Sequence, residues 1–170
     1  MLFWLLTVTK VIICVNILYS NYLYFPYLDE STLVSCSRDN TIKLWTQVED
    51  NYKVAVTLTG HAAAVTCVKF LHKSMSILSC SEDKTVKLWD YSDNTFSCRW
   101  TQFDHDKSVN GVAIAPNDKL VASAGADKMC ILYRTKDGAK VGTFEGHKKG
   151  VWTCAFSPTD QIMATGSADG

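Results

Sequence analysis

The chain has 170 residues, 47% of them hydrophobic and 20% charged, and its 17 basic side chains balance its 17 acidic ones. This composition is that of an ordinary packed protein. Because the net charge is zero, no overall field attracts nucleic acid or acidic lipid, so binding must come from local patches.

Residues 1–30 stand apart from the rest of the sequence. Met1 to Tyr27 is strongly apolar and contains several tyrosines, and Lys10 interrupts its apolar run. A signal peptide would have a basic start and a cleavage site of small residues, which does not fit this segment. A membrane anchor needs about 20 apolar residues, and a lysine near the centre of such a span is costly.

Three interpretations of residues 1–30 therefore stay open. They are a membrane anchor, a divergent strand, and an artefact of the gene model, in which translated non-coding sequence is joined to the coding sequence of residues 31–170. We do not expect a membrane partner.

Residues 31–170 repeat with a period of 42 to 44 residues. Three histidines are each followed by an aspartate 22 residues later, in the pairs His61–Asp83, His105–Asp127 and His147–Asp169. A fourth aspartate, Asp39, lies 44 residues before Asp83, but position 17, where its histidine would fall, is an isoleucine. The register of the repeat is therefore lost near Ser31.

The spacing of apolar residues predicts short strands in each repeat. The fourth residue after each histidine is Val65, Val109 or Val151, and the ninth is Phe70, Ile114 or Phe156. Later in each repeat come the strand-like runs Ile42 to Trp45, Val86 to Asp90 and Cys130 to Tyr133. Turn-forming residues such as Pro116-Asn117-Asp118 separate the runs, and no segment of the repeats favours a helix.

This period and these motifs resemble the WD40 repeat, in which each repeat is a four-stranded blade of a β-propeller. We predict an all-β WD40 β-propeller fragment. It comprises two complete four-stranded blades, Val65 to Thr101 and Val109 to Phe144, preceded by the last three strands of one blade and followed by the first two strands of another. Because a closed propeller needs about four to eight blades, we expect residues 31–170 to be a partial propeller from a longer protein.

Histidine, serine and aspartate recur in every repeat and invite comparison with a catalytic triad. An active site needs one such set in one cleft, whereas here the set recurs, so we interpret it as a structural hydrogen-bonded chain from Asp to His to Ser or Thr to Trp. Tyr133 replaces the tryptophan in the third repeat, which predicts an incomplete chain there. The residues of these tetrads are Ser35, Asp39, Trp45, His61, Ser79, Asp83, Trp89, His105, Ser123, Asp127, Tyr133, His147, Thr165 and Asp169.

The seven cysteines contain no C-x-x-C pair and mostly fall at strand positions where other repeats carry small or apolar residues. They indicate buried packing residues in a reducing compartment, nuclear or cytosolic. No zinc, phosphate-loop or hydrolase motif appears. We therefore expect no catalytic residue, metal, cofactor or small-molecule substrate.

Two segments resemble the transducin beta-like protein 3 family more closely than a generic WD40 repeat. They are Ser108 to Ala122 followed by Gly146 to Trp152, and Phe156 to Gly170; the run Val112-Ala113-Ile114-Ala115-Pro116-Asn117-Asp118-Lys119-Leu120 is the more specific. The resemblance implies a nucleolar, non-enzymatic scaffold of the small-subunit processome, the particle that contains the U3 snoRNP. Its partners would be other WD40 subunits, with contacts to U3 snoRNA or pre-rRNA mostly indirect, and its role would be in 18S rRNA maturation.

A cytosolic WD40 adaptor, such as a G-protein beta-like subunit or a ubiquitin-ligase substrate receptor, would carry the same tetrads and remains the alternative. The number of further repeats beyond Gly170 would distinguish the two. A membrane-tethered propeller depends on residues 1–28.

Overall fold

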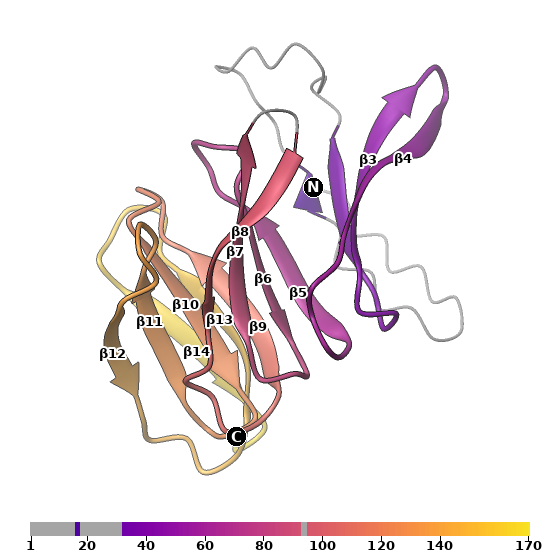
Figure 1. Ribbon diagram of the computed structural model, residues 1–170. Helices are drawn as coiled ribbons and strands as arrows, with labels where there is room; N and C mark the ends of the chain where they lie inside the picture. The colour runs from indigo at the N-terminus through magenta and orange to yellow at the C-terminus, as the bar shows by residue number, and fades with distance from the viewer. Residues whose placement is uncertain (1–15, 18–31, 93–94) are drawn as a thin grey trace.

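The computed structural model describes residues 16–17, 32–92 and 95–170 (Figure 1). Throughout these ranges the regular structure is β-strand, which confirms the all-β WD40 prediction. The interpretations of residues 1–15 and 18–30 lie outside the described part of the chain.

Four antiparallel sheets follow one another in chain order, each made from consecutive strands. The first contains β1 (Asn16–Ile17), β2 (Leu33–Cys36), β3 (Ile42–Val48) and β4 (Asn51–Leu58). The second contains β5 (Val65–Phe70), β6 (Ile77–Ser81), β7 (Val86–Ser92) and β8 (Thr95–Gln102). The third contains β9 (Val109–Ile114), β10 (Leu120–Gly125), β11 (Cys130–Arg134) and β12 (Lys140–Phe144), and the fourth β13 (Val151–Phe156) and β14 (Met163–Ser167).

The first sheet differs from the predicted three strands because the backbone of β1 pairs with β2, with Ile17 opposite Leu33. Ile17 is the position where the repeat spacing calls for a histidine. Backbone hydrogen bonds do not depend on the identity of the side chain, so a strand can form where the sequence motif is absent. The two central sheets end within one residue of the predicted blade limits.

The cores lie between successive sheets, and the second and third sheets bury residues on both of their faces. Val34 and Leu44 of the first sheet pack with Ile77 and Trp89 of the second. Leu88 and Trp100 of the second pack with Tyr133 and other residues of the third, and Ala122 of the third packs with Cys154 of the fourth. This arrangement explains why the strands have near-continuous apolar patterns, such as the fully buried β6.

A β-bulge recurs immediately before the repeated aromatic position of each complete sheet. The register shifts between Leu44 and Trp45, between Leu88 and Trp89, and between Leu132 and Tyr133. A bulge turns the following side chain relative to the strand before it. The bulges therefore help to aim these aromatic rings at the hydroxyl residue of the neighbouring strand.

Candidate functional site

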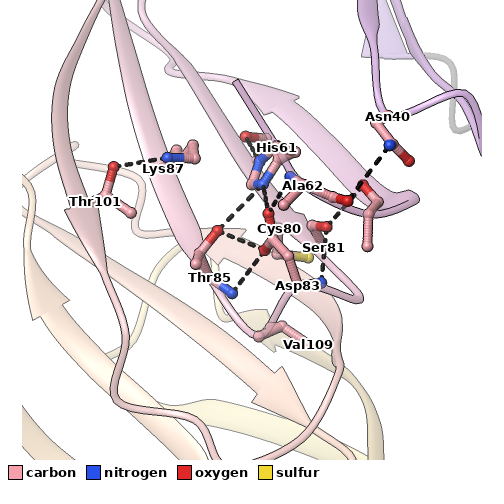
Figure 2. A network of polar contacts seen from close by, with 12 residues as sticks. Asn40, His61, Ala62, Cys80, Ser81, Asp83, Thr85, Lys87, Thr101 and Val109 are labelled. Atoms are coloured by element: carbon pink, nitrogen blue, oxygen red, sulfur yellow. Dashed lines mark hydrogen bonds and ion pairs between the residues drawn. The ribbon is translucent and has the colours of Figure 1, made fainter. Parts of the chain in front are cut away.

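The second sheet brings together all four residues predicted for its tetrad (Figure 2 shows the His61 and Asp83 part). His61 lies in the loop before β5, Ser79 on β6, Asp83 in the β6–β7 turn and Trp89 on β7. His61 Nδ1 lies 2.8 Å from an Asp83 carboxylate oxygen, and His61 Nε2 lies 2.9 Å from Ser79 Oγ. The Trp89 indole donates to the same Ser79 oxygen at 2.9 Å.

The direction of this chain of hydrogen bonds is fixed at its two ends. An indole N–H can only donate and a carboxylate can only accept. Therefore Trp89 donates to Ser79, the Ser79 hydroxyl donates to Nε2 of a neutral His61, and Nδ1–H of His61 donates to Asp83. Every member has a partner, as buried polar groups require.

Asp83 also anchors the two loops that meet at this end of the sheet. One carboxylate oxygen accepts from the Ala62 amide at 2.8 Å, and the other accepts from the Thr85 amide at 2.9 Å and the Thr85 hydroxyl at 2.6 Å. Burial raises the pKa of Asp83, but the hydrogen bonds from Thr85, Ala62 and His61 outweigh that effect and lower the pKa to about 2. Asp83 is therefore ionised at neutral pH.

His61 is held in its neutral form mainly by burial. Desolvation lowers the pKa of His61 below its usual value, and the hydrogen bond and negative charge of Asp83 oppose this shift only in part. A neutral imidazole is the form that can accept from Ser79, so the burial of the ring and the hydrogen-bond pattern agree.

The third sheet brings together His105, Ser123 and Asp127 but does not complete the chain. His105 Nδ1 is 2.8 Å from Asp127, and His105 Nε2 is 2.7 Å from Ser123. Tyr133 is fully buried, yet its hydroxyl has no hydrogen-bond partner in the described part of the chain. Burial raises the pKa of Tyr133 well above its usual value, so the phenol stays protonated.

The first sheet holds only half of a tetrad. Trp45 donates to Ser35 at 2.8 Å, but Asp39 is exposed and accepts from the Thr41 amide and hydroxyl. The hydrogen bond from the Thr41 hydroxyl is the main cause that lowers the pKa of Asp39. Asp39 therefore stabilises its own turn rather than joining two loops.

In the fourth sheet, His147 Nδ1 lies 3.0 Å from Asp169 and His147 Nε2 lies 2.9 Å from Thr165. A hydrogen bond from the Lys148 amide is the main cause that lowers the pKa of Asp169, to about 2. Threonine can therefore bond the histidine at the hydroxyl position of a tetrad, as serine does in the second and third sheets.

Sequence reasoning missed the residue that follows each of these aspartates. Asn40, Lys84 and Lys128 have φ of 69°, 70° and 77°, in the left-handed region, and Gly170 has φ of 95°. In the first three turns the aspartate accepts from the amide two residues later, as Asp127 does from Met129 at 3.2 Å. Lysine gives no signal for such a backbone, so only Asn40 and Gly170 could have indicated it.

The geometry of the tetrads supports cohesion of the sheets rather than chemistry on a substrate. Ser79 and Ser123 are fully buried, so neither hydroxyl is presented to a substrate as a nucleophile. Among the described residues no group of three or more His, Cys, Asp or Glu side chains could hold a metal ion.

Six cysteines fall in the described ranges, and all six are free thiols. Cys36, Cys80, Cys130 and Cys154 are buried, whereas Cys98 is exposed. Burial raises the pKa of the Cys80 thiol well above its usual value, as expected for a packing residue. In the same described ranges, no helix is long and apolar enough to cross a membrane.

Comparison with known proteins gives curated relatives that match short stretches of the chain. One match is 44% identical over 43 residues to the protein named Eukaryotic translation initiation factor 3 subunit I of Aspergillus niger, and another is 35% identical over 43 residues to the protein of that name in Schizosaccharomyces pombe. In both matches the stretch covers 25% of this chain and 13% of the relative.

A model of the family described as WD domain, G-beta repeat matches residues 26–46, 52–90, 96–134 and 138–170. These matches span well over half of the chain, and each of the last three covers the outer strand of one sheet (β4, β8 or β12) and then the first strands of the next sheet. The first begins at residue 26, inside the apolar segment of residues 1–30. The chain therefore belongs to the WD40 family of WD domain, G-beta repeat proteins.

Proposed function

We propose that this WD40 scaffold acts in the small-subunit processome, as a non-catalytic subunit that helps to mature 18S rRNA by docking neighbouring proteins. Its partners are other WD40 subunits of the particle, and its contacts with U3 snoRNA or pre-rRNA are mostly indirect. Its place in the cell is the nucleolus, within the nucleus.

The observation that supports a docking role is the contrast between buried polar side chains and exposed loops in each repeat. The serine hydroxyls of the tetrads, Ser79 and Ser123, are buried inside the sheets and make structural hydrogen bonds. The loops around them are exposed and differ in charge, from Ala62 in one repeat to Asp106 and Lys148 in the next two. Rigid sheets with variable loops are suited to holding protein partners.

The resemblance of Ser108 to Ala122 and of Phe156 to Gly170 to the transducin beta-like protein 3 family supports the choice of the processome. The turn at Pro116-Asn117-Asp118 has a specific contact in the structure. The Asp118 carboxylate accepts from the His72 amide at 3.1 Å and the Lys73 amide at 2.7 Å, both in the preceding sheet's loop.

A second candidate is a cytosolic WD40 adaptor connected with translation initiation. The 43-residue match to Eukaryotic translation initiation factor 3 subunit I favours it. Other adaptors, such as G-protein beta-like subunits and ubiquitin-ligase substrate receptors, would use the same fold.

Purification of the tagged full-length protein from its native cells separates these candidates. The processome proposal predicts that U3 snoRNA and other WD40 processome subunits co-purify and that the tagged protein is nucleolar. Co-purification of translation initiation factor 3 subunits with a cytosolic signal would overturn it in favour of the second candidate. A tagged, unrelated WD40 protein expressed at the same level is the control for nonspecific capture.

A further inference from the structure

Cys67 on β5 and Cys80 on β6 lie directly opposite each other in the second sheet. Residues that are opposite in an antiparallel pair have Cα atoms about 4.5 or about 5.5 Å apart. Both separations fall within the range of about 4.4–6.8 Å that a disulfide spans. The backbone of the sheet therefore holds these two cysteines at a separation that a disulfide can bridge.

The two side chains also lie on the same side of the sheet. Cys80 belongs to the core between the second and third sheets, and Cys67 packs against that core. Thr66, the residue before Cys67, contacts the Cys80 sulfur at 3.2 Å and donates to the Val109 carbonyl of the third sheet at 2.6 Å. Both thiols therefore lie beside a contact that joins the second sheet to the third.

The two thiols differ in their access to solvent. Cys80 is 0% exposed, whereas Cys67 is partly exposed. Burial is the main cause that raises the pKa of Cys80, and the neighbouring Cys67 raises that pKa further. Because the thiolate is the reactive form of cysteine, Cys80 stays a protonated thiol while Cys67 is the sulfur that a small solute reaches first.

The other cysteines of the described ranges do not combine an opposite partner with an accessible thiol. Cys98 is exposed, but the residue opposite it on β7 is Trp89. Cys130 and Cys154 share a core, but both are buried, as is Cys36. The combination of a partly exposed thiol and a buried thiol directly opposite it is therefore specific to the second sheet in this part of the chain.

We propose that Cys67 and Cys80 are a redox-modification site, at which hydrogen peroxide converts the two thiols to a reversible disulfide. In a reducing compartment such a disulfide is transient, because the thiols of that compartment reduce it again. The proposal does not depend on the pathway in which the protein acts.

The reaction has two steps. The Cys67 thiolate attacks one oxygen of hydrogen peroxide, the O–O bond breaks, and the leaving hydroxide takes up a proton to become water, which leaves Cys67 as a sulfenic acid. The Cys80 sulfur then bonds to the Cys67 sulfur, the S–O bond breaks, and the hydroxyl leaves as water with the Cys80 proton. In total the two thiols lose two electrons and two protons, and one hydrogen peroxide is reduced to two waters.

The test is peptide mapping of the full-length chain after graded doses of hydrogen peroxide, with the remaining thiols alkylated before digestion. Trypsin places Cys67 in the peptide 54–69 and Cys80 in the peptide 74–84, and each peptide contains one cysteine. The proposal predicts that the two peptides are recovered as one disulfide-linked pair, which dithiothreitol separates. Exposed Cys98 reports that the oxidant has acted. At the dose that oxidises half of Cys98, recovery of the two peptides as separate alkylated species would overturn the proposal.

Single variants test the order of the two steps, with circular dichroism as the check of their fold. Cys67→Ser should abolish the linked pair and leave Cys80 alkylated, whereas the matched control Cys98→Ser should give the linked pair in wild-type yield. Cys80→Ser should leave Cys67 as a sulfenic acid, which dimedone traps on the peptide 54–69. Oxidation of Cys80 in Cys67→Ser at the wild-type dose, or a folded Cys80→Ser without a dimedone adduct, would contradict the proposed reaction.

Discussion

Gly60 and Trp89 are in close contact across the second sheet: a Cβ added to Gly60 would lie 3.0 Å from the outer edge of the Trp89 ring. Gly60 also has φ of 142°, a backbone that favours glycine. In the third repeat both residues change together, because Asp104 stands in place of the glycine and Tyr133 in place of the tryptophan. The smaller phenol ring leaves room for a side chain at position 104.

This relationship predicts that the two substitutions are coupled. Tyr133→Trp alone should destabilise the protein by roughly 1–3 kcal/mol, because the larger ring overpacks the site beside Asp104. Adding Asp104→Gly should recover a large part of the loss. The measurement is the free energy of unfolding of the two single variants and the double variant in urea. Strictly additive effects would show that positions 104 and 133 do not interact.

Asp83→Ala tests whether the tetrad holds its two loops together. The change leaves buried His61 and Thr85 without their shared acceptor, and each unpaired buried donor costs about 1–3 kcal/mol. We expect a loss of roughly 3 kcal/mol in the free energy of unfolding. Asp39→Ala is the matched control in the same column, because exposed Asp39 accepts hydrogen bonds from Thr41 of its own turn, and it should lose less than about 1 kcal/mol. Equal losses in the two variants would contradict the assignment.

The unpartnered hydroxyl of Tyr133 leads to the opposite expectation. Tyr133→Phe removes a buried polar atom that makes no hydrogen bond within the described residues, so the melting temperature should stay the same or rise. The comparison variant is Trp89→Phe, which removes the donor to Ser79 and should lower stability by roughly 1–3 kcal/mol. A clear loss of stability in Tyr133→Phe would mean that its hydroxyl has a partner.

The stability of the folded protein should decrease at acidic pH because of His61. The pKa of His61 is lowered in the folded protein, so the unfolded chain binds a proton more readily. The stabilisation is fully present above the unfolded value of about 6.5 and is lost as the pH falls through the lower folded value. Asp83, with a pKa of about 2 in place of 3.8, adds a further loss between those two values.

The measurement is a pH titration of the histidine ring signals by nuclear magnetic resonance, together with the melting temperature between about pH 7.5 and about pH 5.5. The His61 midpoint should lie below 6.5 and the melting temperature should fall toward the acidic end. A His61 midpoint at or above 6.5 would contradict the burial argument.

The strands and the tetrad partners could be predicted from the sequence because each rests on a residue type that recurs at a fixed spacing. His61, Ser79, Asp83 and Trp89 recur as a set, and one pattern of apolar residues places both central sheets. The contacts between sheets could not be predicted in the same way. Thr66 on β5 donates to the Val109 carbonyl and Asn110, at the matching position on β9, donates to the Val151 carbonyl. These two side chains differ in chemistry because the acceptor is a backbone carbonyl that any suitable donor can reach.

The pairing of Asn16–Ile17 with β2 also could not be predicted from the sequence, because it depends on the backbone and not on a repeated side chain. The positive φ at Lys84 and Lys128 could not be predicted for a related reason. The aspartate before each lysine fixes the turn by accepting an amide hydrogen bond, so glycine is not needed there. Sequence patterns report side chains, and these features depend on the main chain.

Maturation of 18S rRNA in cells depleted of this protein tests the proposed role most directly. The cells would be rescued with the wild-type full-length chain, with Asp83→Ala, or with the control Asp39→Ala, and precursor and mature 18S rRNA would be quantified. We predict that depletion accumulates 18S precursors, that the wild type and Asp39→Ala restore maturation, and that Asp83→Ala restores it poorly. Normal 18S rRNA after complete depletion would contradict the proposal that this WD40 scaffold serves ribosome assembly.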